Sequence, residues 1–159
     1  MITAALALTI GAPAQTAAQD AARPRVLVVV SGNGADNGKT RPGFEMDELT
    51  QAWAVFADNG LAVDIASPKG GAVVADGFDP AKPYNKRFLA DASASAALAA
   101  TRSLAEVKAA RYDAVFLVGG KGAMFDLSTS ADLKEVILAT DAAGGVIGGV
   151  CHGPAAFMN

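Results

Sequence analysis

A cysteine and a histidine stand side by side in this sequence, where an apolar strand is expected to pass into a helix. Cys151 directly follows the apolar run 145–150, and the next expected helix begins at Gly153. A sharp turn at such a junction exposes the side chain at its apex, as at nucleophile elbows. A helix N-terminus also favours the thiolate and lowers its pKa. We therefore predict that Cys151 is an activated nucleophile beside His152, the only histidine; the alternative is a buried structural cysteine.

A glycine-rich turn follows another expected strand, at 112–118. It comprises Gly119, Gly120, Lys121 and Gly122. Successive glycines let backbone amides turn inward as a cradle for an oxyanion. The same pattern is also found in simple tight turns, so the oxyanion interpretation depends on Cys151 lying in the same sheet.

An acidic residue that could exchange a proton with the thiol is expected near the start of the helix 45–58. Glu48 lies on its first turn, which points to the carboxyl side of the sheet. Glu45 and Asp47 compete for the role, and an acidic first turn is also ordinary helix capping. Spacing alone leaves the choice open.

These residues need a scaffold in which strands and helices alternate. Apolar runs predict four strands, at 25–30, 61–67, 112–118 and 145–150. Helical patterns predict helices at 45–58, 93–110, 130–143 and from 153, and the punctuated segment 72–91 is expected to cross the surface without regular structure. This order predicts an α/β fold, a flavodoxin-like parallel sheet with helices on both faces, whose ligands bind at the carboxyl ends of the strands.

Composition excludes several classes of function. The chain has 159 residues and a net charge of −3, without a basic run, which argues against a nucleic-acid partner. The apolar run 1–11 is too short to span a bilayer, so no membrane partner is expected. Followed by Ala12-Pro13-Ala14, it predicts a signal peptide and linker over 1–24, a domain over 25–159 and a periplasmic or secreted protein. A simple Ala-rich tail on a cytoplasmic protein is the alternative.

A nucleotide-binding loop after the first strand is the main rival interpretation. The stretch from Gly32 to Thr40 ends in Gly-Lys-Thr, but a Walker loop requires glycine where Asn33 stands. Pro42 and Gly43 also delay the helix whose N-terminus would hold phosphate. We therefore discount this interpretation.

Several segments together resemble one family. The stretch 150–159 (VCHGPAAFMN) resembles the nucleophile-elbow signature of the PfpI-like superfamily, which has the class I glutamine amidotransferase-like fold, and 118–127 resembles its oxyanion loop. Segments 39–43, 48–50 and 66–71 resemble the branch that holds stress-response chaperones and glutathione-independent glyoxalases (glyoxalase III). The resemblance covers about residues 25–159.

The resemblance implies roles for the residues above. Cys151 would be the nucleophile, His152 its acid/base partner and Glu48, five residues after Gly43, the paired acid. The amides of Gly120 and His152 would be the oxyanion donors. The implied activity converts 2-oxoaldehydes to 2-hydroxy acids without glutathione, metal or cofactor, and the implied partners are a small aldehyde and a homodimer mate.

Two features depart from the family pattern. The family usually has histidine where Lys121 stands, which affects substrate preference. Its chains continue beyond Asn159, where the third triad residue lies, so we expect this domain to be incomplete at its C-terminus and the 159-residue chain to be inactive alone. Deglycase, hydrolase or peptidase activity is also known in the branch. An alternative from another class is a holding chaperone or thiol redox sensor on the same fold.

Overall fold

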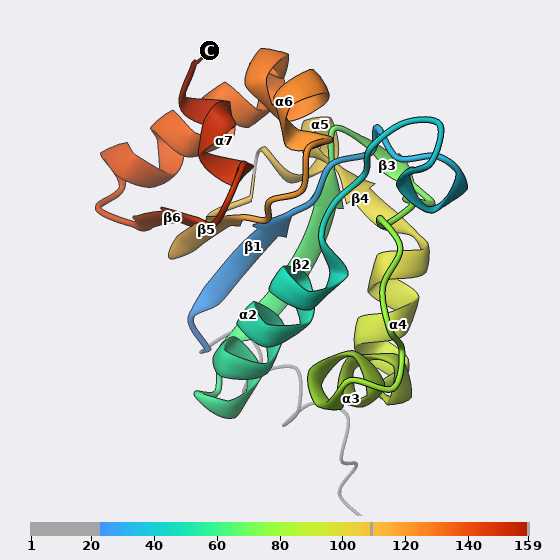
Figure 1. Ribbon diagram of the computed structural model, residues 1–159. Coiled ribbons are helices and arrows are strands. Elements are labelled where there is room, and N and C mark those ends of the chain that lie inside the picture. The colour runs from blue at the N-terminus through green and yellow to red at the C-terminus, as the bar shows by residue number, and fades with distance from the viewer. Residues whose placement is uncertain (1–22, 109, 159) are drawn as a thin grey trace, which may run out of the picture.

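The computed structural model describes residues 23–108 and 110–158, which form a mixed α/β domain around one sheet (Figure 1). Its strand order is β3-β4-β2-β1-β5-β6. Five of the six strands are parallel, and four of these correspond to those predicted: β1 (Arg25–Val29), β2 (Ala62–Ser67), β5 (Ala114–Leu117) and β6 (Val146–Gly149). The order β2-β1-β5-β6 confirms the flavodoxin-like fold.

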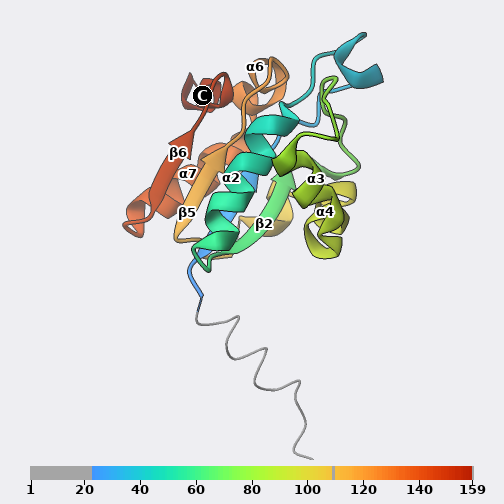
Figure 2. The same cartoon turned by 60° about the horizontal axis from the view of Figure 1, so that its bottom comes forward.

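Side-chain alternation along β1 gives the sheet two apolar faces. Leu27 and Val29 pack on one side, and Val26 and Val28 on the other, all fully buried. The first side is covered by α5 (Leu104–Val107), α6 (Ala123–Asp126) and α7 (Ala131–Ala142). The second is covered by α2 (Met46–Asp58), α3 (Pro83–Ala90) and α4 (Ala92–Ala99), so helices lie on both faces (Figure 2).

The two longest helices follow their sequence signals closely. In α2 the buried residues Met46, Leu49 and Trp53 recur at helical spacing, and the chain turns at Gly60 with a φ of 77°. In α7 the Ser130 hydroxyl caps the N-terminus by accepting from the Leu133 amide at 3.2 Å.

Two segments differ from the prediction. The irregular excursion expected over 72–91 contains α3, because Pro83 is a helix-starting residue at position N1 rather than a break. The single helix expected over 93–110 is α4 followed by β4 (Thr101–Ser103) and α5. β4 pairs in parallel with β2 and antiparallel with β3 (Lys69–Gly71), so sheet pairing at Thr101–Ser103 interrupts the expected helix.

The predicted signal peptide lies almost wholly in residues 1–22, outside the described residues. Within the part that the structure describes, no helix has both the length and the apolar character needed to cross a bilayer.

Candidate active site

Cys151 lies at the turn between β6 and the 3₁₀ helix Gly153–Met158, and its side chain is exposed. Its φ of 55° is in the left-handed region, which is uncommon for a residue with a Cβ. The Gly153 amide closes the turn by donating to the Val150 carbonyl at 2.8 Å. A side chain at Gly153 would collide with the carbonyl of Leu117. The turn therefore has the tight, strained geometry expected of a nucleophile elbow.

His152 supplies the polar contact of the thiol. Its Nδ1 lies 3.2 Å from Cys151 Sγ, close enough for the two groups to share a proton. Within residues 23–108 and 110–158 the imidazole has no second hydrogen-bond partner, so no acid there orients the ring. The last acidic residue in the sequence, Asp141, lies on α7.

Glu48 approaches the same site from the first turn of α2. Its Oε2 accepts a hydrogen bond from the Gly119 amide at 2.8 Å. A Cβ added to Gly119 would lie 2.5 Å from this oxygen and 2.6 Å from the Cβ of Cys151. The carboxylate and the cysteine therefore both border the bare face of this glycine, and any side chain there would push them apart.

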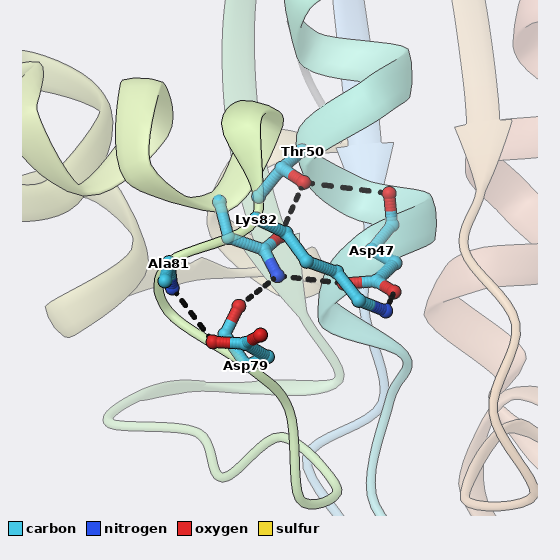
Figure 3. Close-up of polar contacts among 6 residues, drawn as sticks. Asp47, Thr50, Asp79, Ala81 and Lys82 are labelled. Carbon is cyan, nitrogen blue, oxygen red and sulfur yellow. Dashed lines mark hydrogen bonds and ion pairs between the residues drawn. The ribbon is translucent and has the colours of Figure 1, made fainter.

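Asp47, one of the two competitors of Glu48, is directed toward α3 instead (Figure 3). Its carboxylate pairs with Lys82 and accepts a hydrogen bond from the buried amide of Asn85 at 2.6 Å. The hydrogen bond from Lys82, and then that from Asn85, lower the pKa of Asp47. Asn85 also accepts from the Thr50 hydroxyl at 2.7 Å, so this network fastens α3 to α2 rather than serving the thiol.

Glu45, the other competitor, contributes through its backbone. Its amide donates to the Gly119 carbonyl at 3.2 Å, while its side chain makes no hydrogen bond in the described part of the chain. Burial raises the pKa of Glu45, and the nearby charge of Asp76 raises it further. Of the three acidic residues, Glu48 is thus the one whose carboxylate is hydrogen-bonded to the glycine beside Cys151.

In the glycine-rich turn, some backbone amides are hydrogen-bonded within the described part of the protein and others are not. Gly119 donates to Glu48, and Gly122 donates to the Gly43 carbonyl at 2.9 Å. Among the described residues the amides of Gly120 and His152 have no acceptor, which leaves them available to a ligand oxygen. Gly120 has a φ of 93° and would collide with Phe44 if it carried a Cβ, so glycine is required there. The side chain of Lys121 is exposed.

Asp76, a residue that sequence reasoning missed, supports the glycine-rich turn indirectly. Its Oδ1 accepts from the Gly43 amide at 2.7 Å, and the carbonyl of Gly43 holds the amide of Gly122. Asp76 lies in the segment expected to be an irregular excursion, where no periodicity marks it. In residues 23–108 and 110–158 no group of three or more His, Cys, Asp or Glu side chains could together hold a metal ion.

Comparison with known proteins finds relatives whose names agree with one another. The probable glutathione-independent glyoxalase SNO4 of Saccharomyces cerevisiae is 30% identical over 132 residues, which cover 77% of this chain and 53% of the yeast protein. The glutathione-independent glyoxalase HSP31 of the same yeast is 30% identical over 118 residues, covering 74% of this chain and 44% of its own. The chain thus spans about half the length of the curated relatives that it matches.

Solved structures agree with this result. The Rapid Encystment Protein 24 kDa of Francisella tularensis superposes with a TM-score of 0.74 and 32% identity over 84% of this chain and 60% of its own. Glyoxalase III of Candida albicans superposes with a TM-score of 0.70 and 25% identity over 84% of this chain and 59% of its own. The sequence model of the DJ-1/PfpI family matches residues 40–159. The resemblance to the PfpI-like superfamily and its glyoxalase III branch is thereby confirmed, and the chain belongs to the DJ-1/PfpI family.

Proposed function

We propose that this chain uses Cys151 to convert 2-oxoaldehydes of the methylglyoxal type into 2-hydroxy acids without glutathione. Relatives named as glutathione-independent glyoxalases support this reaction class. The observation that carries the proposal is the arrangement around Gly119, whose amide donates to Glu48 and whose bare face borders both that carboxylate and Cys151. A nucleophile and a carboxylate base on one small glycine face suit a substrate with two adjacent reactive carbons.

The first step is addition of the thiolate to the aldehyde. The Cys151 thiol proton passes to His152 Nδ1, 3.2 Å away, and a carbon–sulfur bond forms at the aldehyde carbon. The aldehyde oxygen becomes an oxyanion, which the unoccupied amides of Gly120 and His152 stabilise before it takes up a proton. The product of this step is a thiohemiacetal.

The second step moves hydrogen between the two carbons. Glu48 removes the proton from the former aldehyde carbon, giving an enediol, and a proton returns to the neighbouring carbon. The first carbon is thereby oxidised to a thioester and the second is reduced to an alcohol, so no external oxidant is required. Water then cleaves the carbon–sulfur bond, releasing the 2-hydroxy acid and the thiol.

The test is lactate formation from methylglyoxal in the absence of glutathione, followed by proton NMR. The assay uses a longer form of the protein that carries the residues which the family pattern places after Asn159. We expect lactate with its wild type and with Lys86→Gln, an exposed control on α3, and only the uncatalysed background with Cys151→Ala. Equal lactate formation by Cys151→Ala would overturn the proposal.

A thiol redox sensor is a second candidate, which the exposure of Cys151 favours. An exposed thiol paired with an imidazole is accessible to peroxide, and oxidation of Cys151 would stop at sulfenate, sulfinate or an intermolecular disulfide, because the chain has no second cysteine. Oxidation by peroxide without any aldehyde turnover would favour the sensor over the glyoxalase.

Export and self-association are further proposals that come from the sequence. Cleavage after Ala14 predicts a mature protein beginning near Gln15, which N-terminal sequencing from the native host tests; intact Met1 in the cytoplasm would refute it. Light scattering tests the homodimer, and a monomer across micromolar concentrations would exclude it.

A further inference from the structure

The first turn of α2 carries Glu48, but its own helix gives that turn few hydrogen bonds. The amides of the first three residues have no acceptor within the helix, because the first intrahelical hydrogen bond runs from the Leu49 amide to the Glu45 carbonyl at 3.2 Å. Glu45, at the N-cap, makes no capping hydrogen bond with its side chain in the described part of the chain. The position of Glu48 therefore depends on contacts that come from outside α2.

Asn85 of α3 supplies such contacts. Its side chain is only 1% exposed. The amide nitrogen donates to Asp47 Oδ1 at 2.6 Å and to the carbonyl of Asp79 at 2.9 Å, and the amide oxygen accepts from the Thr50 hydroxyl at 2.7 Å. The side chain is fixed in this orientation, because flipping the amide would set its oxygen against the Asp47 carboxylate.

The two α2 partners of Asn85 bracket Glu48 in the sequence (Figure 3). Asp47 directly precedes Glu48, and Thr50 follows it by two residues. Residues three apart are neighbours on a helix surface, so Asp47 and Thr50 face α3 together. Glu48 is turned by about 100° from Asp47, and its carboxylate accepts from the Gly119 amide at 2.8 Å. Asn85 thus holds the side of the turn next to the one that carries Glu48.

A small rotation of α2 about its axis would displace the carboxylate. Side chains reach about 5–6 Å from the axis of a helix, so a rotation of about 10° moves a side-chain end by about 1 Å. A shift of that size away from Gly119 would break its 2.8 Å hydrogen bond with Glu48, since such bonds extend only to about 3.2 Å. The hydrogen bonds at Asp47 and Thr50 oppose this rotation, because they hold one side of the turn against α3.

From these contacts we propose that Asn85 is a positioning residue for Glu48. Through Asp47 and Thr50 it fixes the first turn of α2, so that the Glu48 carboxylate stays on the Gly119 amide. It acts through the helix and not on the thiol. Its effect on turnover rests on the proposed function, whereas its effect on the Gly119 amide does not.

Hydrogen exchange of the Gly119 amide, followed by NMR in the longer form of the protein, tests the proposal without any reaction. Asn85→Asp keeps the side-chain volume but removes the donor to Asp47. We expect exchange at Gly119 to accelerate about tenfold or more beyond any change at the amides of β1, which report global unfolding.

The matched control breaks the other link between the same two helices. Arg87 Nη1 donates to Asp58 Oδ2 at 2.9 Å, at the last residue of α2. This pair lies about 15 Å along the helix from Glu48. Arg87→Gln should therefore leave exchange at Gly119 within about twofold of the wild type, since the pair is exposed and distant. Equal acceleration at Gly119 in Asn85→Asp and Arg87→Gln would overturn the proposal.

A second pair of variants decides the matter if Asn85→Asp does not fold. Thr50→Val keeps the shape of the side chain without its hydroxyl and should accelerate exchange at Gly119, whereas Thr50→Ser keeps the hydroxyl and should exchange as the wild type does. The same exchange rate in both Thr50 variants, or equal acceleration at Gly119 and in β1, would overturn the positioning role.

Kinetics extend the test to the proposed reaction. In Asn85→Asp, kcat for lactate formation should fall about tenfold or more while iodoacetamide alkylates Cys151 at the wild-type rate, because only proton transfer by Glu48 is impaired. An unchanged kcat in a variant with accelerated exchange at Gly119 would overturn the catalytic part of the inference. The expected exchange pattern without turnover in the wild type would support the positioning role and refute the proposed reaction instead.

Discussion

Replacing Gly119 by alanine tests the arrangement of Glu48 and Cys151 directly. The new Cβ would lie 2.5 Å from Glu48 Oε2 and 2.6 Å from Cys151 Cβ, whereas an ordinary contact begins at 3.4 Å. The carboxylate must therefore retreat by about 0.9 Å, and the cysteine by a similar amount. A misplacement of about 1 Å costs about 100-fold in rate, which corresponds to about 2.7 kcal/mol in the barrier.

Steady-state kinetics with methylglyoxal measure this effect as kcat/KM. Gly148→Ala is the matched control, because its Cβ would make only an ordinary contact, 3.5 Å from the Phe116 ring. We expect the control to stay within about threefold of the wild type, since volume changes that fit are tolerated. A folded Gly119→Ala variant with kcat/KM equal to that of the control would refute the reasoning that both groups must meet over this glycine.

Three further predictions follow from the contacts around the site. Glu48→Gln should abolish methylglyoxal turnover while Glu45→Gln retains it, since of these two side chains only the Glu48 carboxylate is hydrogen-bonded to Gly119; equal activity would remove Glu48 from the mechanism. Asp76→Ala should lower the free energy of unfolding in urea by about 2 kcal/mol through the loss of a charged hydrogen bond, and Asp76→Asn should recover most of it; no difference between the two would exclude an anchoring role. Because burial raises the pKa of Asp126, the contribution of this carboxyl group to stability should fall as the pH rises from its ordinary pKa of 3.8 through the folded value, whereas Asp47, Asp58 and Glu106, whose pKa values are lowered, contribute the opposite slope. Asp126→Asn should therefore make stability rise more steeply with pH in urea titrations, and an unchanged slope would contradict this prediction.

The elements that carry strong local signals could be predicted from the sequence. The apolar run of β1 and the helical spacing of Met46, Leu49 and Trp53 are visible in the sequence. The same residues are buried in the fold, so the sequence pattern predicts the element. β4 could not be predicted, because three residues are too few to show a period and its stability comes from pairing with β2 and β3. Pro83 was misjudged because proline both ends and begins helices.

The site was predictable only in part for a related reason. The position of Cys151 is local, since strand, turn and helix follow one another in the sequence. The choice among Glu45, Asp47 and Glu48 depends on partners far away in the chain: Lys82 and Asn85 engage Asp47, and Gly119 engages Glu48. Asp76 acts only through such a distant contact, and no residue type or spacing marks it.

The glycine-rich turn is held by main-chain groups, and this bears on how new specificities evolve. The carbonyl of Gly43 fixes one end of the turn and the amide of Glu45 the other. The exposed side chains of Lys121, Met124 and Phe125 take no part in those bonds. Mutations at these three positions can therefore change the exposed surface while the amides of the turn keep their places. The exposed surface beside the turn can therefore change in evolution without loss of the hydrogen bonds that hold the turn, because the two features are encoded in different atoms.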